Sequence, residues 1–149
     1  MKPLTELKIA ICSDHAGYKL KNELIEYLKM KKLAALKDFG TYSAESCDYP
    51  DYAHPLATAV ENGEFDFGIA LCASGNGVNI TVNKHKGIRG ALCWMSEIAF
   101  LARKHNDANV ISLPAHFISQ EEAKKMIDIF LTTDFEGGRH QRRIEKIPY

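Results

Sequence analysis

Short apolar runs alternate with helical patterns along this chain, and this alternation constrains the fold more than any other feature. Residues 8–12 (KIAIC), 67–71 and 109–113 are typical of buried strands, and shorter apolar runs lie at 33–36 and within 87–93. Helical spacing separates them at 18–30, 52–61, 96–105 and 120–132, the last preceded by a capping box at Ser119 and Glu122. Parallel strands need such crossovers. We therefore expect an α/β fold with a five-stranded, mostly parallel sheet and helices on both faces.

Length and charge narrow the class of protein. The 149 residues suffice for one domain, so we expect residues 1–149 to form a single domain. Nineteen basic residues balance nineteen acidic ones, which argues against nucleic acid or membrane as a partner. No apolar run approaches the length of a membrane span, and the first residues (MKPLTEL) lack a signal-peptide core. The cysteines Cys12, Cys47, Cys72 and Cys93 form no CxxC pair, so we expect free thiols and a reducing cytoplasm.

Polar clusters follow three of the predicted strands where each strand ends. Asp14 and His15 follow the first strand, residues 72–77 (CASGNG) follow the third, and a loop beginning at Pro114 follows the fifth. In a three-layer, Rossmann-like fold, ligands bind outside the carboxyl ends of the strands. We therefore expect these three segments to form one site.

Cys72 stands where a buried strand meets a glycine-rich loop, and its surroundings exclude several kinds of site. The loop lacks the third glycine of a dinucleotide fingerprint and the GK[ST] of a phosphate-binding loop, and no metal-ligand spacing surrounds Cys72. Val78 occupies the position where a cysteine phosphatase needs arginine. A thiolate that acts as an acid–base catalyst remains, since backbone N–H groups and a helix start would stabilise both the thiolate and a substrate oxyanion. A cysteine that only packs in the core is the alternative that these residues leave open.

Six segments, in this order and spanning nearly the whole chain, resemble the ribose-5-phosphate isomerase type B family, which includes galactose-6-phosphate and allose-6-phosphate isomerases. They are CSDHAG, CDYPDYA, LCASGNG, NKHKGIR, KHNDANV and FEGGRHQRRI. The resemblance implies an aldose–ketose isomerase of the non-oxidative pentose phosphate pathway, which interconverts D-ribose 5-phosphate and D-ribulose 5-phosphate through a cis-enediolate without metal or other cofactor. It also implies a homodimer, sometimes paired into a tetramer, whose sites are shared between subunits. The tail, about residues 135–149, would then pack on a partner subunit.

The resemblance also implies roles for individual residues. Cys72 would be the base that moves a proton between C1 and C2, and Ser74 would hold the enediolate with the backbone of Gly75, Asn76 and Gly77. His105 would open the furanose ring, assisted by Asp14. The expected substrate contacts are His15, Arg139 and Arg143 at the phosphate and Tyr49 and Asn106 along the sugar.

Simpler roles fit several of these residues as well. His105 fits a helix-end histidine that bonds to the last carbonyls, Asp14 and His15 fit a helix cap, and Tyr49 fits packing. Arg139 and Arg143 are four residues apart and would share one side of a helical tail, where guanidinium groups suit phosphate. A solvated basic tail is the alternative, and we expect no more than that of His140 and Arg142. The tail has too few apolar residues to anchor itself on its own core, which favours a tail that lies on a partner subunit.

Two positions depart from the family pattern. Some members use a glutamate base just past the glycine loop, where this chain has Val78, so the reaction should depend on Cys72. Many relatives also have a phosphate-facing arginine after the fifth strand, whereas this chain reads Leu-Pro-Ala-His, ending at His116. Two other functions therefore stay open: a six-carbon sugar-phosphate isomerase, and a non-catalytic domain that binds a sugar phosphate or nucleotide.

Overall fold

The structure, a computed structural model that describes residues 1–149, contains a five-stranded sheet in which every strand pair is parallel. The strand order is β2-β1-β3-β5-β4. The strands are β1 (Lys8–Ser13), β2 (Ala35–Asp38), β3 (Phe67–Cys72), β4 (Gly90–Leu92) and β5 (Val110–Pro114). The predicted α/β fold is confirmed.

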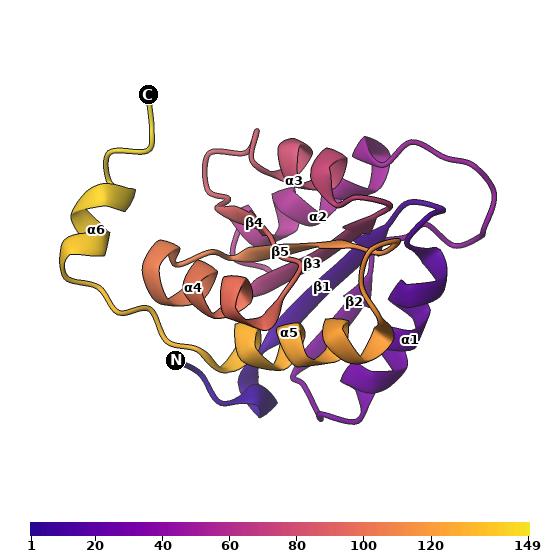
Figure 1. The fold of residues 1–149 in the computed structure, drawn as a ribbon, viewed down its shortest axis with the longest axis horizontal. Helices are drawn as coiled ribbons and strands as arrows, with labels where there is room; N and C mark the ends of the chain where they lie inside the picture. Colours follow the sequence, from indigo (N-terminus) through magenta and orange to yellow (C-terminus); the bar gives the residue numbers. More distant parts are fainter.

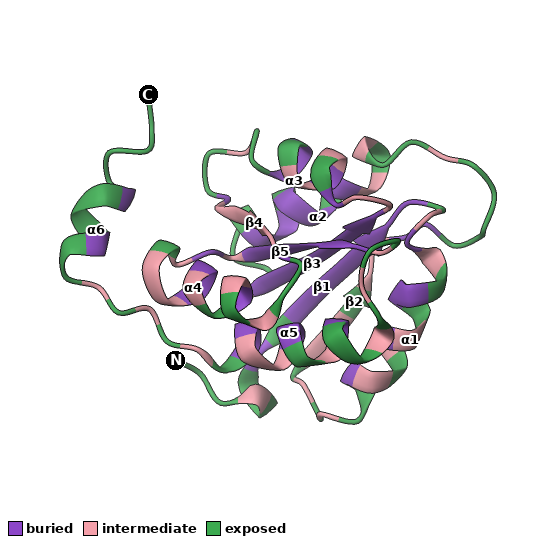
Figure 2. Ribbon diagram, viewed as in Figure 1, coloured by how far each residue is buried: buried purple, intermediate pink, exposed green.

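Helices cover both faces of the sheet (Figure 1). The side chains of α1 (Tyr18–Lys29), α4 (Ser96–Asn106) and α5 (Gln120–Thr132) form one core with the sheet, and those of α2 (Pro50–Glu61) and α3 (Asn76–Val82) form the other. Within β1, Ile9 and Ile11 face the first core while Ala10 and Cys12 face the second, as the two-residue period of a strand requires. Figure 2 shows β1, β3 and β5 buried between the two helical layers, whereas the edge strands β2 and β4 are only partly buried.

The chain also has two short helices, one at each end. A single 3₁₀ turn, η1 (Leu4–Glu6), precedes β1, and α6 (Arg139–Ile144) lies in the tail. No helix combines the length and the apolar character that crossing a membrane requires.

Three predicted boundaries can be compared with the observed ones. The capping box of α5 is present, since Ser119 Oγ accepts from the backbone N–H of Glu122 at 3.1 Å and Glu122 Oε1 accepts from that of Ser119 at 3.0 Å. β2 begins two residues later than the apolar run at 33–36, because it is a half-buried edge strand whose side chains give a weak apolar pattern. α2 begins at Pro50 rather than residue 52, since proline is pre-organised for a first helical position, and Pro55 therefore lies inside the helix.

The tail contradicts the expectation that it cannot anchor on its own chain. Residues Arg139–Ile144 form the short helix α6, so Arg139 and Arg143 share one side of a helix, and α6 packs against α4. Ile144 and His140 are buried, while Arg139 and Arg143 are exposed. Two side chains of α6 are therefore covered within the same chain.

Candidate active site

The three polar segments predicted to meet at the carboxyl edge of the sheet do lie together. The backbone N–H of Asp14 donates to the Leu71 carbonyl at 3.2 Å, which ties the end of β1 to β3. Ala115 N–H donates to the Cys72 carbonyl at 2.9 Å, and His116 N–H to the Ala73 carbonyl at 3.0 Å. Backbone hydrogen bonds therefore fix the geometry of this edge.

Cys72 is the last residue of β3 and is 5% exposed. Cys72 packs in the same core cluster as Cys12 and Val78, so it does contribute to the core. It also lies where the glycine-rich loop begins, so packing and a role in the site are compatible. Burial raises the pKa of the Cys12 thiol, and it raises the pKa of Cys93 to about 12. Those two thiols therefore stay protonated at neutral pH and are unsuitable as bases.

The loop after Cys72 presents unpaired backbone donors. Gly75 has a φ of +76°, and a Cβ there would lie 2.4 Å from Cδ1 of Leu92, so only glycine fits this position. Ser74 Oγ accepts from the backbone N–H and the side-chain amide of Asn76, at 3.3 and 3.1 Å. The backbone N–H groups of Ser74, Gly75 and Gly77 have no acceptor within the chain. Free N–H groups beside a thiol can hold an oxyanion while the thiol moves a proton.

Tyr49 lies directly on this loop. A Cβ added at Gly77 would be 2.6 Å from Cζ of the Tyr49 ring, so the ring packs against the bare backbone of Gly77. Tyr49 is the N-cap residue of α2 and is 38% exposed. Tyr49 therefore lies beside the loop that follows Cys72.

Asp14 and His15 occupy the turn between β1 and α1. Asp14 Oδ1 accepts from the backbone N–H groups of Ala16 and Gly17, at 2.9 and 3.2 Å, so Asp14 closes the turn rather than capping the helix. His15 Nδ1 accepts from the backbone N–H of Cys47 at 3.2 Å. This bond puts the proton of a neutral His15 on Nε2, where it can be donated to an anion.

The other predicted residues lie at the opposite end of the sheet. α4 ends at Asn106, and the chain then enters β5 at Val110, which pairs with Gly68 near the start of β3. Cys72 pairs with Pro114 at the far end of β5. These two pairs are four residue steps apart along the strand, or about 13 Å at the usual rise of a strand. Within one chain, therefore, His105, Asn106, Arg139 and Arg143 do not join Cys72.

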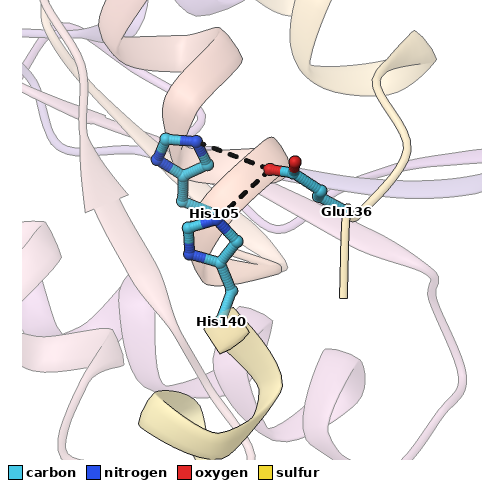
Figure 3. A group of neighbouring side chains, drawn as sticks. All are labelled: His105, Glu136 and His140. Atoms are coloured by element: carbon cyan, nitrogen blue, oxygen red, sulfur yellow. Dashed lines mark ion pairs between the residues drawn. The ribbon is translucent and has the colours of Figure 1, made fainter. Parts of the chain in front are cut away.

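His105 lies in a cluster that the sequence did not reveal (Figure 3). Its ring stacks on His140, with centroids 4.2 Å apart and planes 12° apart, so it is not simply a helix-end histidine. Nε2 of His105 and of His140 are 3.7 and 3.2 Å from the same oxygen of Glu136. Burial, followed by the charges of His105 and Arg139, lowers the pKa of His140. His140, expected to be a solvated tail residue, is thus a buried partner of His105. In the sequence, only the four-residue spacing of Glu136 and His140 could have indicated a contact of this kind.

Lys21 is a second residue that the sequence analysis missed. Its side chain is fully buried, and its ammonium group donates to Asp38 Oδ1 at 2.6 Å and to the Thr41 carbonyl at 2.7 Å. Thr41 N–H in turn donates to the Ser13 carbonyl at 2.7 Å, so Lys21 braces the segment beside the end of β1. The sequence did indicate that Lys21 could be buried, because Lys21 lies three residues before Leu24 on the apolar face of α1.

Comparison with known proteins gives consistent relatives. Residues 9–147 match the model of a family described as Ribose/Galactose Isomerase. Ribose-5-phosphate isomerase B of Escherichia coli is 43% identical over 140 residues, which cover 94% of this chain and 93% of that protein. The crystal structure of a ribose 5-phosphate isomerase from Thermotoga maritima has a TM-score of 0.92 at 50% identity, covering 95% of this chain and 97% of the other.

One solved relative contains a sugar phosphate. Ribose-5-phosphate isomerase B from Mycoplasma genitalium, with bound ribulose-5-phosphate, has a TM-score of 0.89 at 44% identity. The two chains are covered to 94% and 93%. The fold, the arrangement at the carboxyl edge and these likenesses agree, and the chain belongs to the ribose/galactose isomerase family.

Proposed function

We propose that this chain is an aldose–ketose isomerase that interconverts D-ribose 5-phosphate and D-ribulose 5-phosphate. One observation carries the proposal: Cys72 ends β3 directly beside a loop whose N–H groups at Ser74, Gly75 and Gly77 have no acceptor. Relatives named ribose-5-phosphate isomerase B, one of them with bound ribulose-5-phosphate, support the substrate.

The loop and the thiol divide the proton transfer between them. The Cys72 thiolate takes the proton from C2 of the open-chain aldose, and the C2–H electron pair forms the C1–C2 double bond of a cis-enediolate. The Cys72 thiol then returns that proton to C1, while the hydroxyl proton passes from O2 to O1. Ser74 and the backbone donors of Gly75, Asn76 and Gly77 stabilise the charge on the enediolate oxygens.

Ring opening has to precede this step because ribose 5-phosphate exists mostly as a furanose. We assign it to His105, which can accept the proton of the anomeric hydroxyl and return it to the ring oxygen. Asp14, whose second carboxylate oxygen has no protein donor, assists at the ring hydroxyls. His15, Arg139 and Arg143 bind the phosphate, and Tyr49 and Asn106 line the sugar.

A second copy of the chain is needed to assemble this set of residues. Cys72 and His105 lie at opposite ends of one sheet, so a single chain cannot offer both to one sugar. We propose a homodimer in which the tail of one subunit, about residues 135–149, reaches the carboxyl edge of the other. The exposure of Arg139 and Arg143 on α6 supports this arrangement, because charge-assisted contacts to a phosphate would engage both.

Subunit complementation tests both the roles of Cys72 and Arg139 and the proposal that the two subunits share each site. Inactive Cys72→Ala is mixed with inactive Arg139→Ala, and the subunits are allowed to exchange. If Arg139 acts on the neighbouring subunit, a mixed dimer gathers both lesions in one site, and activity returns toward half of wild type per mixed dimer. Arg139→Ala mixed with Arg143→Ala is the control, since each site then keeps one lesion. No recovery in the first mixture despite proven heterodimers would exclude the shared site.

A six-carbon sugar phosphate is the second candidate substrate. His116, which follows β5, is exposed at the carboxyl edge where many relatives have an arginine, and a single imidazole would hold a phosphate more weakly than a bidentate guanidinium. Coupled assays with ribose 5-phosphate and allose 6-phosphate, run side by side with EDTA, decide between the substrates. Faster turnover of allose 6-phosphate would overturn the pentose assignment. No turnover of either would favour a binding domain.

The cysteines bear on where this chemistry takes place. All four are free, and Cys12 and Cys93 are buried without a partner cysteine. Oxidising compartments favour disulfides, so we propose that the chain works in the reducing cytoplasm.

A further inference from the structure

The turn that ends α4 has a backbone conformation that needs support. Asp107, directly after the last residue of the helix, has φ and ψ of +46° and +45°, a left-handed conformation that few residues other than glycine adopt. Surrounding contacts have to hold such a conformation. His105 and Asn106 are the two residues directly before Asp107, so the contacts that hold this turn also hold the end of the helix that carries them.

Two arginines bind the two carboxylate oxygens of Asp107 separately. Nη2 of Arg89 donates to Oδ2 at 3.0 Å, and Nη1 of Arg103 donates to Oδ1 at 2.9 Å. Arg103 is buried and also donates to the Ala108 carbonyl at 2.6 Å. Asp107 therefore bridges a guanidinium group of its own helix and one from the segment before β4.

Arg89 also holds the backbone of the turn. Its Nε donates to the carbonyl of Asn106 at 2.9 Å and to that of Asp107 at 3.2 Å, and its Nη2 donates to the Asp107 carbonyl at 3.0 Å. The last carbonyls of a helix have no partner within the helix, so a guanidinium group here supplies donors that they lack. One planar group thus holds two successive carbonyls and a carboxylate.

The backbone of Arg89 is tied to the start of β5. Its N–H donates to Asn109 Oδ1 at 2.9 Å, and its carbonyl accepts from the Asn109 N–H at 3.0 Å. The side-chain amide of Asn109 donates to the Gly87 carbonyl at 2.8 Å. Arg89 therefore connects the amino end of β5 to the end of α4.

We infer that Arg89 is a positioning residue for His105 and Asn106, and that it acts through Asp107 and the last carbonyls of α4. The inference rests on the proposed function, in which His105 opens the furanose ring and Asn106 lines the sugar. Proton transfer requires a well-defined position of the imidazole, and a misplacement of about 1 Å can lower a rate by about 10²-fold. Arg89 and Asp107 therefore support ring opening and have little influence on the proton transfer at Cys72.

Turnover from both substrates tests this role in the full chain. Arg89→Met removes every donor of the guanidinium group. We expect turnover of ribose 5-phosphate to fall by about 10- to 100-fold, and turnover of ribulose 5-phosphate to fall less because it needs no ring opening. Arg89→Lys should be almost as impaired, since one ammonium group cannot replace the planar fork of donors. Full activity of Arg89→Lys, or equal losses in both directions, would each overturn the inference.

Asp107→Gly separates the contacts of Asp107 from the conformation of the turn. Glycine adopts a positive φ without strain, so a turn that needs only its conformation would work normally in this variant. We instead expect a direction-dependent loss like that of Arg89→Met. The double variant should lose less than the product of the two single losses, because the substitutions break a shared interaction. Normal turnover in Asp107→Gly, or losses that multiply in the double variant, would contradict a joint role of the two residues.

Lys84→Met is the matched control. Lys84 is exposed on the segment between α3 and β4 that also carries Arg89. The substitution removes the same charge, and we expect wild-type turnover in both directions. A loss in this control similar to that in Arg89→Met would overturn the inference, since charge alone would then explain the effect.

Amide hydrogen exchange measures the support of the turn without recourse to activity. The N–H groups of Asp107 and Ala108 donate to the carbonyls of Arg103 and Ala102, at 3.2 and 3.1 Å. We expect roughly tenfold faster exchange of both in Arg89→Met, because the turn opens more easily without its guanidinium contacts. Faster exchange in a chain whose wild type isomerises no sugar would contradict the proposed function and leave the support of the turn standing. An active chain in which Arg89→Met changes neither exchange nor turnover would overturn the inference alone.

Discussion

The two ends of the sheet hold their functional residues in different ways. At the carboxyl end, backbone hydrogen bonds from Asp14 and Ala115 fix the loop of Cys72 to its neighbours. At the amino end, His105 is held by ring stacking and ion-pair contacts between side chains, and Arg139 is exposed to solvent. The end to which we assign the proton transfer is therefore fixed by backbone bonds within one chain. The end to which we assign ring opening and phosphate binding is held by side chains, which can adjust to a ligand or a partner.

The largest effect should come from the carboxyl end. Cys72→Ala should lower turnover by about 10²–10⁴-fold, the usual loss on removing a general base, while substrate binding is retained. Cys93→Ala is the control, because burial raises the pKa of that thiol to about 12 and keeps it inert. Iodoacetamide should also label Cys72 faster than Cys12 or Cys93. Turnover close to wild type in Cys72→Ala would end its assignment as the base.

The support beneath the carboxyl end can be broken separately. Lys21→Met should lower the free energy of unfolding by about 3 kcal/mol, since it leaves Asp38 and the Thr41 carbonyl without their buried donor. Urea denaturation measures this change. Lys29→Met on the same helix, where the lysine makes only an exposed pair with Glu26, should change stability by less than about 0.5 kcal/mol. Equal effects of the two substitutions would show that Lys21 does not brace this edge.

At the amino end, the effect should depend on the direction of the reaction. His105→Asn should slow the conversion of ribose 5-phosphate by roughly 10²-fold, the lower range for an acid–base group. The reverse reaction should suffer less, because ribulose 5-phosphate cannot close to a furanose and needs no ring opening. Turnover is measured from both substrates. Equal losses in both directions would instead give His105 a general role in binding or structure.

The smallest effect concerns pH and the side-chain contacts near β4. Hydrogen bonding from the Gly87 N–H, and then from His85, lowers the pKa of Glu61 below its ordinary 4.5 despite an opposing effect of burial. The folded state thus favours the carboxylate, and this stability is present above pH 4.5 and lost as the pH falls through the lowered value. The melting temperature of Glu61→Gln should fall below that of wild type at pH 7, and the difference should shrink toward pH 3. Glu26→Gln, at an exposed pair, should show little difference at either pH.

Most of the fold could be predicted because its signals are local. The capping box at Ser119 and the apolar runs of β1, β3 and β5 need no distant partner to be recognised. β2 was misplaced by two residues because an edge strand is half buried and its position is set by pairing with β1. The position of Lys21 on the apolar stripe of α1 was a local signal, but its buried charge could be expected only with its partners Asp38 and Thr41, which lie on a different segment.

The site was predicted only in part, for a reason that lies in the path of the chain. Strand ends brought Asp14, Cys72 and the Pro114 loop together, since parallel strands present their carboxyl ends at one edge. His105 ends a crossover helix that runs back along the sheet, so it belongs to the other edge. The stacking of His140 on His105 depends on the turn at Gly137 and Gly138, which the composition of a basic tail does not reveal.

The position of β5 between β3 and β4 gives this protein an order of assembly during synthesis. β4 leaves the ribosome before β5, yet β5 is its only partner strand. Leu113 and Pro114 also supply the wall against which Gly75 packs. Domains fold as units, so a nascent chain that ends before β5 has an unpaired sheet edge and a loop after Cys72 without its wall. The loop after Cys72 therefore cannot acquire its shape before β5 has been synthesised, and a β3 already paired with β1 would until then have an unpaired edge.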